Sequence, residues 1–414
     1  MSNTQLVADV VAKIGLPLLE NELGWVSKSL YRAHEDEYGN NVNGYKKGAS
    51  IRIRRPADFT MRSGAAVSTQ DVIEGYTTLT VDQQVGVDFN ISGLDLTLKD
   101  TDRNVRIIKP AMSAIANGIA ADIATVMYRG AYNWVGTAGN TIDSFSDFAV
   151  GATRMDLMAI PQDERFALLS PTDYWGLLGS QTALYMNGPA QDAYRQGNLG
   201  MIGGIDTMMS QVIPTHTCGT RDNTTPFVKG ATQEVTYDTA KNTWTQSLLT
   251  DGHDASVTIK AGDVFTIANV YSVNPKTKVS TGVLQQFVVT ADVTAQATTT
   301  NTTTLTISPP IIITGPHQTV NSSPADDAAM TFVGTASTDY RQNLFYHKNA
   351  LALACVPMEM PDGATGGSRS SYKGFSMRVQ PYYDGVNDLN KWRIDVLYGR
   401  ALIDPRLIVR VSGT

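Results

Sequence analysis

The sequence predicts an α+β fold that carries an all-β insertion. Three observations support this class. Apolar residues recur at helical spacing between residues 100 and 134, residues 45–91 alternate between apolar and polar, and residues 220–345 divide into short strands separated by turns. At 414 residues, the chain is long enough for two or three domains with separate cores.

The longest expected element is a helix between Asp100 and Trp134. Thr101 and Asp102 are suitable caps near its start, and Pro110 predicts either a kink or a late start. A continuous helix of this length, roughly 50 Å, suits either a core helix of an α+β enzyme or a strut through an elongated, flat subunit. Its buried stripe should consist of Ile108, Met112, Ile115, Ile119, Ile123 and Val126.

The composition excludes several classes of protein. A net charge of −6 argues against a general nucleic-acid binder, and two cysteines are too few for a disulfide framework. Cys218 and Cys355 are therefore expected to be thiols of a reducing compartment, with one bridge between them as the alternative. The sequence predicts neither a signal peptide nor a membrane-spanning helix, which indicates a cytosolic protein.

The first 91 residues are expected to form an arm and a hairpin. A helix over Thr4–Leu19 should stop at Pro17, and the acidic stretch His34–Gly44 follows it. Strands near Ile51–Arg54 and Thr78–Phe89 then flank a long polar tip. Six basic residues lie in this hairpin; we favour pairing with acidic residues of a neighbouring subunit over nucleic-acid binding, because no aromatic residues are interleaved with them.

The middle of the chain reads as a mixed region followed by the insertion. Helices are expected over Asp147–Ile160 and Pro171–Leu178, the latter capped by Ser170, with a buried strand at Phe166–Leu169 between them. The glycines between Gly197 and Pro214 should form a turn, because no phosphate-binding motif surrounds them. The insertion should be a small barrel with strands at Glu234–Tyr237, Val257–Ile259, Val264–Ile267, Gln286–Val289, Leu305–Ile307 and Ile311–Thr314, and with a loop at Thr298–Thr304.

The last part of the chain should return to the core of the protein. Ala350–Val356 reads as helix or buried strand, and strands are expected at Phe375–Gln380, Lys391–Tyr398 and Leu407–Val411.

The sequence contains few of the motifs that are typical of catalytic or metal sites. Its five histidines are scattered, and no zinc motif or nucleophile elbow is present. His216 and Cys218 form a His-x-Cys pair that supplies two metal ligands at most. We therefore expect no catalytic residue, no cofactor and no metal site.

Several stretches, in their order along the chain, resemble a known family. They are Leu168–Leu178, Gly197–Pro214, Lys260–Lys278 with Leu305–Ile312, and Trp392–Val411. The chain resembles the major capsid proteins of tailed phages with the HK97-type fold. It is most similar to the coat proteins of the phage P22 group, which carry an all-β insertion domain in the later half of the chain.

This resemblance implies a subunit that assembles with itself into hexamers and pentamers, forming the icosahedral shell around double-stranded DNA. A scaffolding protein, a portal and a decoration protein are the further implied partners, DNA would touch the inner surface only non-specifically, and no membrane is involved. Assembly would take place in the bacterial host cytoplasm, and the protein would end in the virion capsid. The implied divisions are an N-terminal arm (1–44), an extended hairpin loop (45–91), a spine helix region (92–135), a peripheral and axial α/β core (136–219), the insertion domain (220–345) and the remainder of the core (346–414).

Charged residues on the expected protrusions are the candidate contacts between subunits. In the family, an extended loop of the insertion joins capsomers, and Tyr237–Trp244 would be that loop here, although it is less acidic than the family's version. The candidates are Lys46, Lys47, Arg52, Arg54, Arg55 and Arg62 of the hairpin and Asp238 and Lys241 of the insertion. The rival functions are a phage tail or baseplate structural protein and a cytosolic enzyme.

Overall fold

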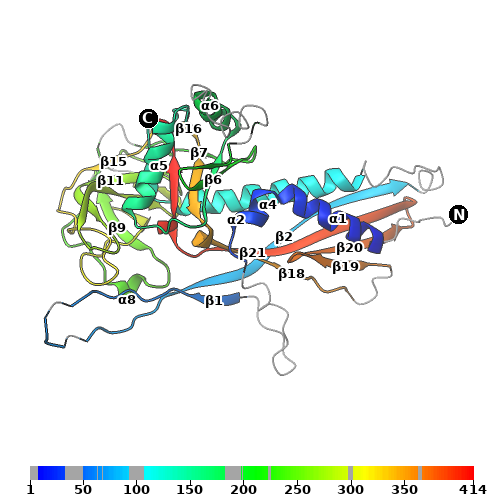
Figure 1. The fold of residues 1–414 in the computed structure, drawn as a ribbon, viewed down its shortest axis with the longest axis horizontal. Helices are drawn as coiled ribbons and strands as arrows, with labels where there is room; N and C mark the ends of the chain where they lie inside the picture. Colours follow the sequence, from blue (N-terminus) through cyan, green and yellow to red (C-terminus); the bar gives the residue numbers. More distant parts are fainter. Residues whose placement is uncertain are drawn as a thin grey trace. The chain divides into compact units, whose positions relative to one another are not determined.

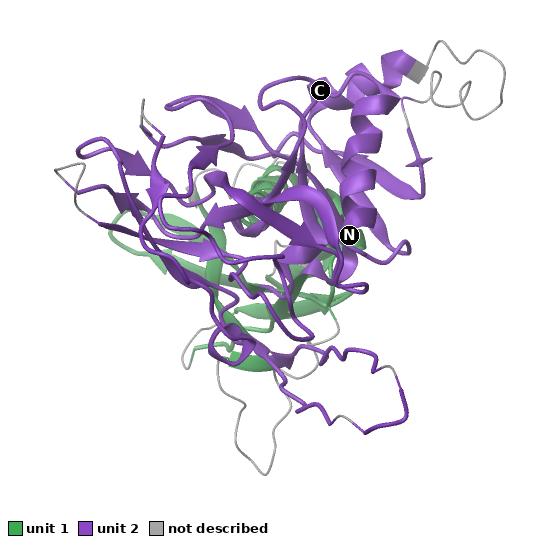
Figure 2. Ribbon diagram, turned by 90° about the vertical axis from the view of Figure 1, so that its left-hand side faces the viewer, with its two compact units in different colours: residues 1–52, 78–123, 351–401 green, residues 53–77, 124–350, 402–414 purple. Residues whose placement is uncertain are grey.

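The computed structural model describes residues 8–32, 50–62, 64–67, 69–92, 107–181, 197, 199–221, 225–296, 302–361 and 366–414. The chain forms two compact units (Figures 1 and 2). Unit 1 contains residues 1–52, 78–123 and 351–401, and unit 2 contains residues 53–77, 124–350 and 402–414. The α+β class expected from the sequence is confirmed, because both units combine helices with sheets.

The expected long helix is α4, which covers Lys109–Gly130. Its α-helical part begins one residue before Pro110 and directly follows a π-helical pair at 107–108; residues 93–106, which include the expected caps Thr101 and Asp102, lie outside the described residues, so neither expected effect of Pro110 is tested. The expected stripe is buried from Ile108 to Ile123, whereas Val126 is only half-buried and Met127 continues the stripe. Trp134 is not part of the helix but lies in strand β3 (Asn133–Val135).

By length and composition alone, α4 could cross a membrane, contrary to the sequence expectation. However, 56% of its most apolar window is buried inside the protein, as in many core helices.

Unit 1 is built around a long antiparallel sheet. The strand order is β1-β2-β21-β20-β19, and β18 also pairs with β21. These strands are β1 (Ser50–Arg54), β2 (Tyr76–Ser92), β18 (Leu351–Val356), β19 (Ser368–Tyr372), β20 (Phe375–Asp384) and β21 (Leu389–Leu402). The segment Ala350–Val356, expected as helix or buried strand, is a strand from Leu351 onward. Ala350 is the last residue of the 3-10 turn η3 (Lys348–Ala350) before it.

The N-terminal helices also belong to unit 1. They are α1 (Ala8–Leu23) and α2 (Trp25–Ser29), and α1 packs on β19 and β20. The expected stop at Pro17 was wrong, because α1 continues for another six residues. Proline within a helix costs about 3 kcal/mol. Leu16, Leu19 and Leu23 are fully buried, and their burial offsets that cost.

Unit 2 contains the mixed core sheet, in the order β3-β22-β17-β4-β6-β5. Neighbouring strands are parallel in the pairs β3–β22 and β4–β6, and antiparallel elsewhere. The strands not yet defined are β4 (Arg165–Leu169), β5 (Met201–Ile202), β6 (Ile205–Met209), β17 (Asn343–His347) and β22 (Ile408–Val411). The expected glycine turn is confirmed, because Gly203 and Gly204 join β5 to β6 with φ angles of 55° and 80°.

Two helices accompany this sheet, α5 (Phe145–Leu157) and α6 (Pro171–Gln181). The Ser170 cap is confirmed, because the Asp173 backbone amide donates to the Ser170 hydroxyl at 3.2 Å. The small pair β7 (Thr215–Thr217) and β16 (Asp339–Arg341) lies beside the entry to and the exit from the insertion.

Helix α5 approaches the sheet so closely that one position needs glycine. A Cβ at Gly151 would lie 2.7 Å from the Phe345 ring and 2.8 Å from a Val411 methyl group. We expect Gly151→Ala to destabilise the protein, because overpacking costs about 1–3 kcal/mol while the gain in helix propensity is about 1 kcal/mol. Urea unfolding measures the difference. Gly118→Ala in α4, where a Cβ meets nothing within 4 Å, is the control and should be neutral or stabilising.

The insertion forms a closed barrel within unit 2. Its six strands follow the order β15-β11-β12-β14-β9-β8. A bridge between Phe227 and Ala329, together with the bond from the Val228 amide to the Ala328 carbonyl (3.0 Å), joins the two ends of this series. The strands are β8 (Phe227–Val228), β9 (Gln246–Asp251), β11 (Val264–Val273), β12 (Ser280–Val289), β14 (Thr303–Ser308) and β15 (Met330–Phe332). The pair β10 (Thr258–Ile259) and β13 (Val293–Thr294) accompanies them.

Three expectations for the insertion were wrong. Glu234–Tyr237 is not a strand, because helix α8 begins at Tyr237 and ends at Ala240. Ile311–Thr314 is an irregular segment whose Ile311 amide is satisfied by the Gln246 side chain instead of a ladder partner. Of the loop expected at Thr298–Thr304, Thr303 and Thr304 belong to β14 instead, and residues 298–301 lie outside the described residues.

Candidate assembly surfaces

The loop between β1 and β2, residues 55–75, projects from the rest of unit 2 (Figure 2). We call these residues the projecting loop. Its base is held by hydrogen bonds: the Arg55 amide donates to the Gly75 carbonyl at 2.8 Å, and the Arg55 guanidinium donates to the Thr77 hydroxyl at 2.8 Å. The exposed guanidinium of Arg54 lies 3.3 Å from the Glu74 carboxylate. The expected hairpin is thus present, with its ends tied together.

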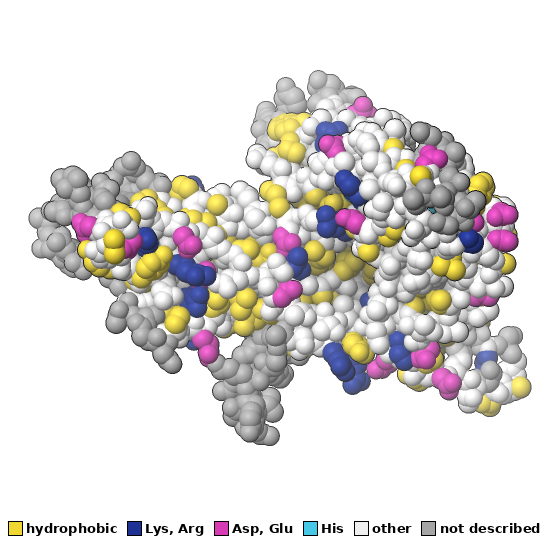
Figure 3. Space-filling model, turned by 180° about the vertical axis from the view of Figure 1, so that it is seen from behind, with side chains coloured by type: hydrophobic (Ala, Val, Ile, Leu, Met, Phe, Trp, Pro, Cys, Tyr) yellow, Lys and Arg dark blue, Asp and Glu magenta, His cyan; other side chains and the backbone are white. Residues whose placement is uncertain are grey.

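The tip of the projecting loop exposes apolar side chains. Phe59 is 60% exposed, Met61 95%, Val67 81% and Val72 64%. Hydrophobic groups are visible on this projection at the lower right of Figure 3. Arg62 is exposed as well, and its guanidinium donates to the Gly64 and Ala66 carbonyls, which stiffens the tip. Four exposed apolar side chains on one protrusion make this tip a candidate interaction site.

Helix α8 of the barrel lies against the base of the projecting loop. Asp238 and Lys241 form an ion pair with each other at 2.6 Å, and the Lys241 carbonyl accepts a hydrogen bond from the Arg55 guanidinium at 3.5 Å. The Tyr76 amide donates to the Asn242 side chain at 3.2 Å. The segment expected to be a free loop is therefore a short helix bonded to the neighbouring part of its own chain.

Trp244 joins these elements. Its ring is 4% exposed, and the guanidiniums of Arg55 and Arg406 both lie over it, at 5.7 Å and 5.4 Å from the centroid. Arg406 comes from the 3-10 turn η4 (Pro405–Leu407) and binds the Asp404 carboxylate at 2.7 Å. Although burial opposes it, this cation holds the pKa of Asp404 below its usual value. Sequence reasoning missed Trp244 and Arg406, because they lie some 160 residues apart in elements with unrelated patterns.

Not all of the sequence-derived candidates can be placed. Arg52 is exposed on β1, and Lys46 and Lys47 lie outside the described residues. Arg54, Arg62 and Asp238 are exposed, whereas Arg55 is half-buried and engaged within its own subunit. The candidates that the structure describes lie on the projecting loop, on α8 and its C-cap Lys241, and on the strand β1 that leads into the loop.

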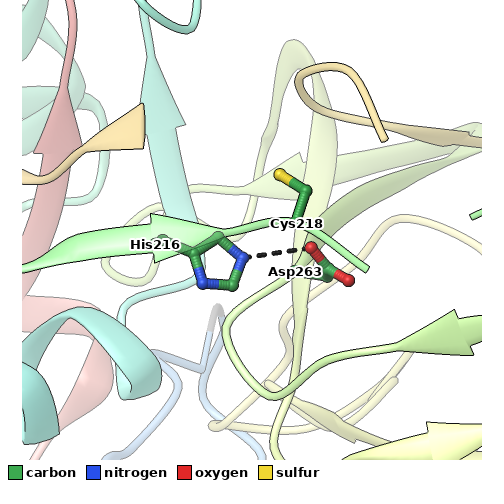
Figure 4. A group of neighbouring side chains, drawn as sticks. All are labelled: His216, Cys218 and Asp263. Atoms are coloured by element: carbon green, nitrogen blue, oxygen red, sulfur yellow. Dashed lines mark hydrogen bonds and ion pairs between the residues drawn. The ribbon is translucent and has the colours of Figure 1, made fainter. Parts of the chain in front are cut away.

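A buried polar cluster is the place to look for a metal (Figure 4). The potential ligand atoms of His216, Cys218 and Asp263 all lie within 4.8 Å of one another. The sequence showed only the first two, because Asp263 follows in the barrel, 45 residues after Cys218. The imidazole Nε2 lies 3.0 Å from the Asp263 carboxylate, toward which the ring is turned in Figure 4.

The side chains of this cluster are engaged with other groups of the protein. Burial raises the pKa of Cys218 to about 11 and lowers that of His216, so both side chains are neutral. The Asp263 carboxylate already accepts bonds from the Gly219 and Lys260 amides, and it lies 3.6 Å from the Arg221 guanidinium. The Asp263 carboxylate thereby neutralises the charge of the buried Arg221 side chain.

One candidate pocket among the described residues is a polar hollow beside Thr414. It is lined by Gly139, Asn140, Thr141, Asp143, Ser144, Asp147 and Thr414. Burial would raise the pKa of Asp147, but bonds from Thr414 and Ser144 outweigh it and lower the pKa to about 2. Its carboxylate is therefore a charged acceptor at neutral pH, engaged by its neighbours, and it is not poised to transfer a proton.

Comparison with known proteins places the chain among phage coat proteins. The family model described as P22 coat protein, gene protein 5, matches residues 31–413. A curated relative, the major capsid protein of Acyrthosiphon pisum secondary endosymbiont phage 1, is 23% identical over 312 residues, which is 73% of each chain.

Two solved structures are similar as well. That of Mycobacterium phage Che8 covers 93% of this chain and 89% of its own, with 12% identity and a TM-score of 0.49. The CUS-3 coat protein I-domain covers 27% of this chain and 96% of its own, with 31% identity and a TM-score of 0.20.

The class of protein is thus that of phage shell subunits, and the match over nearly the whole length identifies the group. The chain belongs to the P22 coat protein family. The resemblance drawn from the sequence, to tailed-phage major capsid proteins of this group, is confirmed.

Proposed function

We propose that the protein assembles with copies of itself into hexamers and pentamers, which close into the icosahedral shell around the phage's double-stranded DNA. The observation that carries this proposal is the projecting loop, whose tip exposes Phe59, Met61, Val67 and Val72. Apolar side chains on an extended loop lose little water within one subunit, so a second copy is the partner that would bury them.

The divisions of the chain expected from the resemblance are part of this proposal. The barrel supports an insertion at 220–345, because its strands bury a core of their own, including Phe265, Phe287, Leu305 and Ile307. Helix α4 supports the spine region at 92–135, and β1 with β2 supports the hairpin at 45–91. The arm at 1–44 and the core segments at 136–219 and 346–414 complete the subunit.

The same proposal covers partners and location. A scaffolding protein, a portal and a decoration protein would join the shell, which would assemble in the host cytoplasm. The inner surface would meet DNA only non-specifically. We also propose that the subunit acts structurally and catalyses no reaction. The Asp147 and Asp263 carboxylates, which accept hydrogen bonds from Thr414 and from the Gly219 and Lys260 amides, support this view.

Of the eight charged candidates, Arg54 is the most open to test as a contact between subunits. Its side chain is 82% exposed, so the pair with Glu74 adds little to the stability of one subunit. We expect Arg54→Glu to leave thermal unfolding unchanged and to slow shell formation severalfold, as followed by light scattering.

The control for Arg54 is the exchange of both charges, Arg54→Glu with Glu74→Arg, which restores the pair between β1 and the projecting loop. If the exchanged protein assembles normally, Arg54 acts only within its own subunit, and its proposed role between subunits is wrong. Continued slow assembly of the exchanged protein supports a charge contact with a neighbour.

A further inference from the structure

A small cavity within unit 2 is lined by parts of the barrel together with η4. About 20 Å³ of it is open to a water-sized particle, which is room for one water molecule, and a chloride ion is only slightly larger. Its lining includes Trp244, which follows α8, Lys278 of the turn between β11 and β12, Arg406 of η4, and His317. None of the described residues that line it carries a carboxylate.

Two nitrogen atoms of this lining are buried and have no hydrogen-bond partner among the described residues. They are Nε1 of the Trp244 indole and Nδ1 of the His317 imidazole, and the two side chains are 4% and 8% exposed. An indole nitrogen can only donate, and a buried donor without an acceptor is costly. The His317 Nδ1 lies 3.5 Å from the Asp58 carboxylate, which favours the tautomer with its proton on that nitrogen. Both atoms are thus donors that require an acceptor.

The charges around the cavity leave one cation without a carboxylate. The Arg406 guanidinium pairs with the carboxylates of Asp404, at 2.7 Å, and Asp58, at 3.8 Å. The Lys278 ammonium is half-buried; it donates to a backbone carbonyl and forms no ion pair with a described residue. The Arg55 guanidinium lies over the indole ring. Three cations therefore face two carboxylates, and one negative charge would complete the balance.

We propose that this cavity binds one small monovalent anion of the halide class, such as chloride. The anion accepts the Trp244 indole N–H and lies beside the Lys278 ammonium, and its charge balances the remaining cation. A water molecule could accept from the same indole, but it would leave that charge unbalanced. The bound anion connects the barrel with η4 inside one subunit. This inference therefore goes beyond shell assembly and does not depend on it.

Thermal unfolding of the unassembled full-length chain tests the site. Sodium chloride is exchanged for sodium gluconate at constant pH and ionic strength, because gluconate is too large for the cavity. We expect the melting temperature to rise with the chloride concentration, by about 3 °C when chloride is at about ten times its dissociation constant. Sodium bromide should have a similar effect. Equal melting temperatures in chloride and gluconate would overturn the proposal.

Variants separate this site from general effects of salt. Lys278→Met removes the cation, and Trp244→Phe removes the indole N–H but keeps an aromatic ring. Because a hydrogen bond to a charged group is lost or the counter-charge is removed, each variant should need at least about tenfold more chloride for the same rise in melting temperature. Lys276→Met is the matched control, since Lys276 is exposed in the same turn and does not line the cavity. Equal chloride responses of Lys278→Met and Lys276→Met would contradict the anion site.

Anomalous X-ray scattering from crystals of the unmodified chain grown in bromide gives a readout that needs no variant. We expect one bromide peak in the cavity. Density there without an anomalous signal, as a water molecule gives, would overturn the proposal. Shell assembly is not part of any of these measurements, so failure of the anion site and failure of the proposed function are told apart.

Discussion

Replacing Asp263 by asparagine is expected to destabilise the protein by about 3–5 kcal/mol, the usual cost of leaving buried charge without its partner. Asp263 is fully buried, and its carboxylate lies beside His216 and Arg221. Burial would raise the pKa of Asp263, but the His216 and Arg221 side chains hold it below the usual value, so the carboxylate is charged at neutral pH. Asparagine keeps the shape of the side chain and one acceptor oxygen, which can serve both the Gly219 and Lys260 amides, but it removes the charge and replaces the second oxygen by an NH2 donor.

Equilibrium unfolding in urea measures this loss. Asp339→Asn is the control, because Asp339 is an exposed carboxylate on the nearby strand β16, bonded to the Thr217 hydroxyl, and little change is expected. Adding Arg221→Met to Asp263→Asn should recover part of the lost stability, since one unpaired cation is then removed. An Asp263→Asn protein as stable as the control would show that the cluster does not depend on this charge.

Met61→Asp is expected to lower the yield of shells at least tenfold without changing the stability of the subunit. Met61 is 95% exposed, so a charge there costs the isolated chain almost nothing. Burying a methionine side chain is worth roughly 1.5–3 kcal/mol, and roughly 1.4 kcal/mol is a tenfold change in an association constant. The contact would be repeated in every subunit of a shell, which multiplies the effect.

Two substitutions control this experiment. Met61→Leu keeps an apolar side chain and should assemble, whereas Thr69→Asp adds the same charge at an exposed polar position of the same loop and should have a smaller effect. Sedimentation separates shells from unassembled subunits. Normal shell yield from Met61→Asp would refute the apolar contact of the loop tip, and equal losses in Met61→Asp and Thr69→Asp would point to charge alone.

Much of the fold could be predicted from the sequence, because periodic burial leaves a periodic pattern. The stripe from Ile108 to Ile123 predicted α4, and the alternation around Val85 predicted β2. Errors arose where tertiary packing overrode local signals. Pro17 does not stop α1, because Leu19 and Leu23 after it are buried. Ile311 is not part of a strand, because its backbone amide donates to the Gln246 side chain instead of to a neighbouring strand.

The assembly surfaces were predictable only in part. The charges of the projecting loop were visible in the sequence, but their partners were not. Arg55 turned out to lie on Trp244, nearly 190 residues away, and Asp263 completes the His216–Cys218 cluster from a different element. Such contacts depend on how the barrel closes, and a short-range sequence pattern cannot predict that closure. The exposed apolar tip, by contrast, could have been noticed from Phe59, Met61 and Val67 in an otherwise polar loop.

The most direct test of shell formation is electron microscopy of the full-length chain, expressed alone and together with the proteins encoded beside its gene. We expect closed shells in at least one condition. Shells of mixed size from the chain alone, and of uniform size with a neighbouring gene product, would identify a scaffolding partner. A chain that remains monomeric in every condition, or that forms only open tubes, would contradict assembly of hexamers and pentamers into an icosahedral shell.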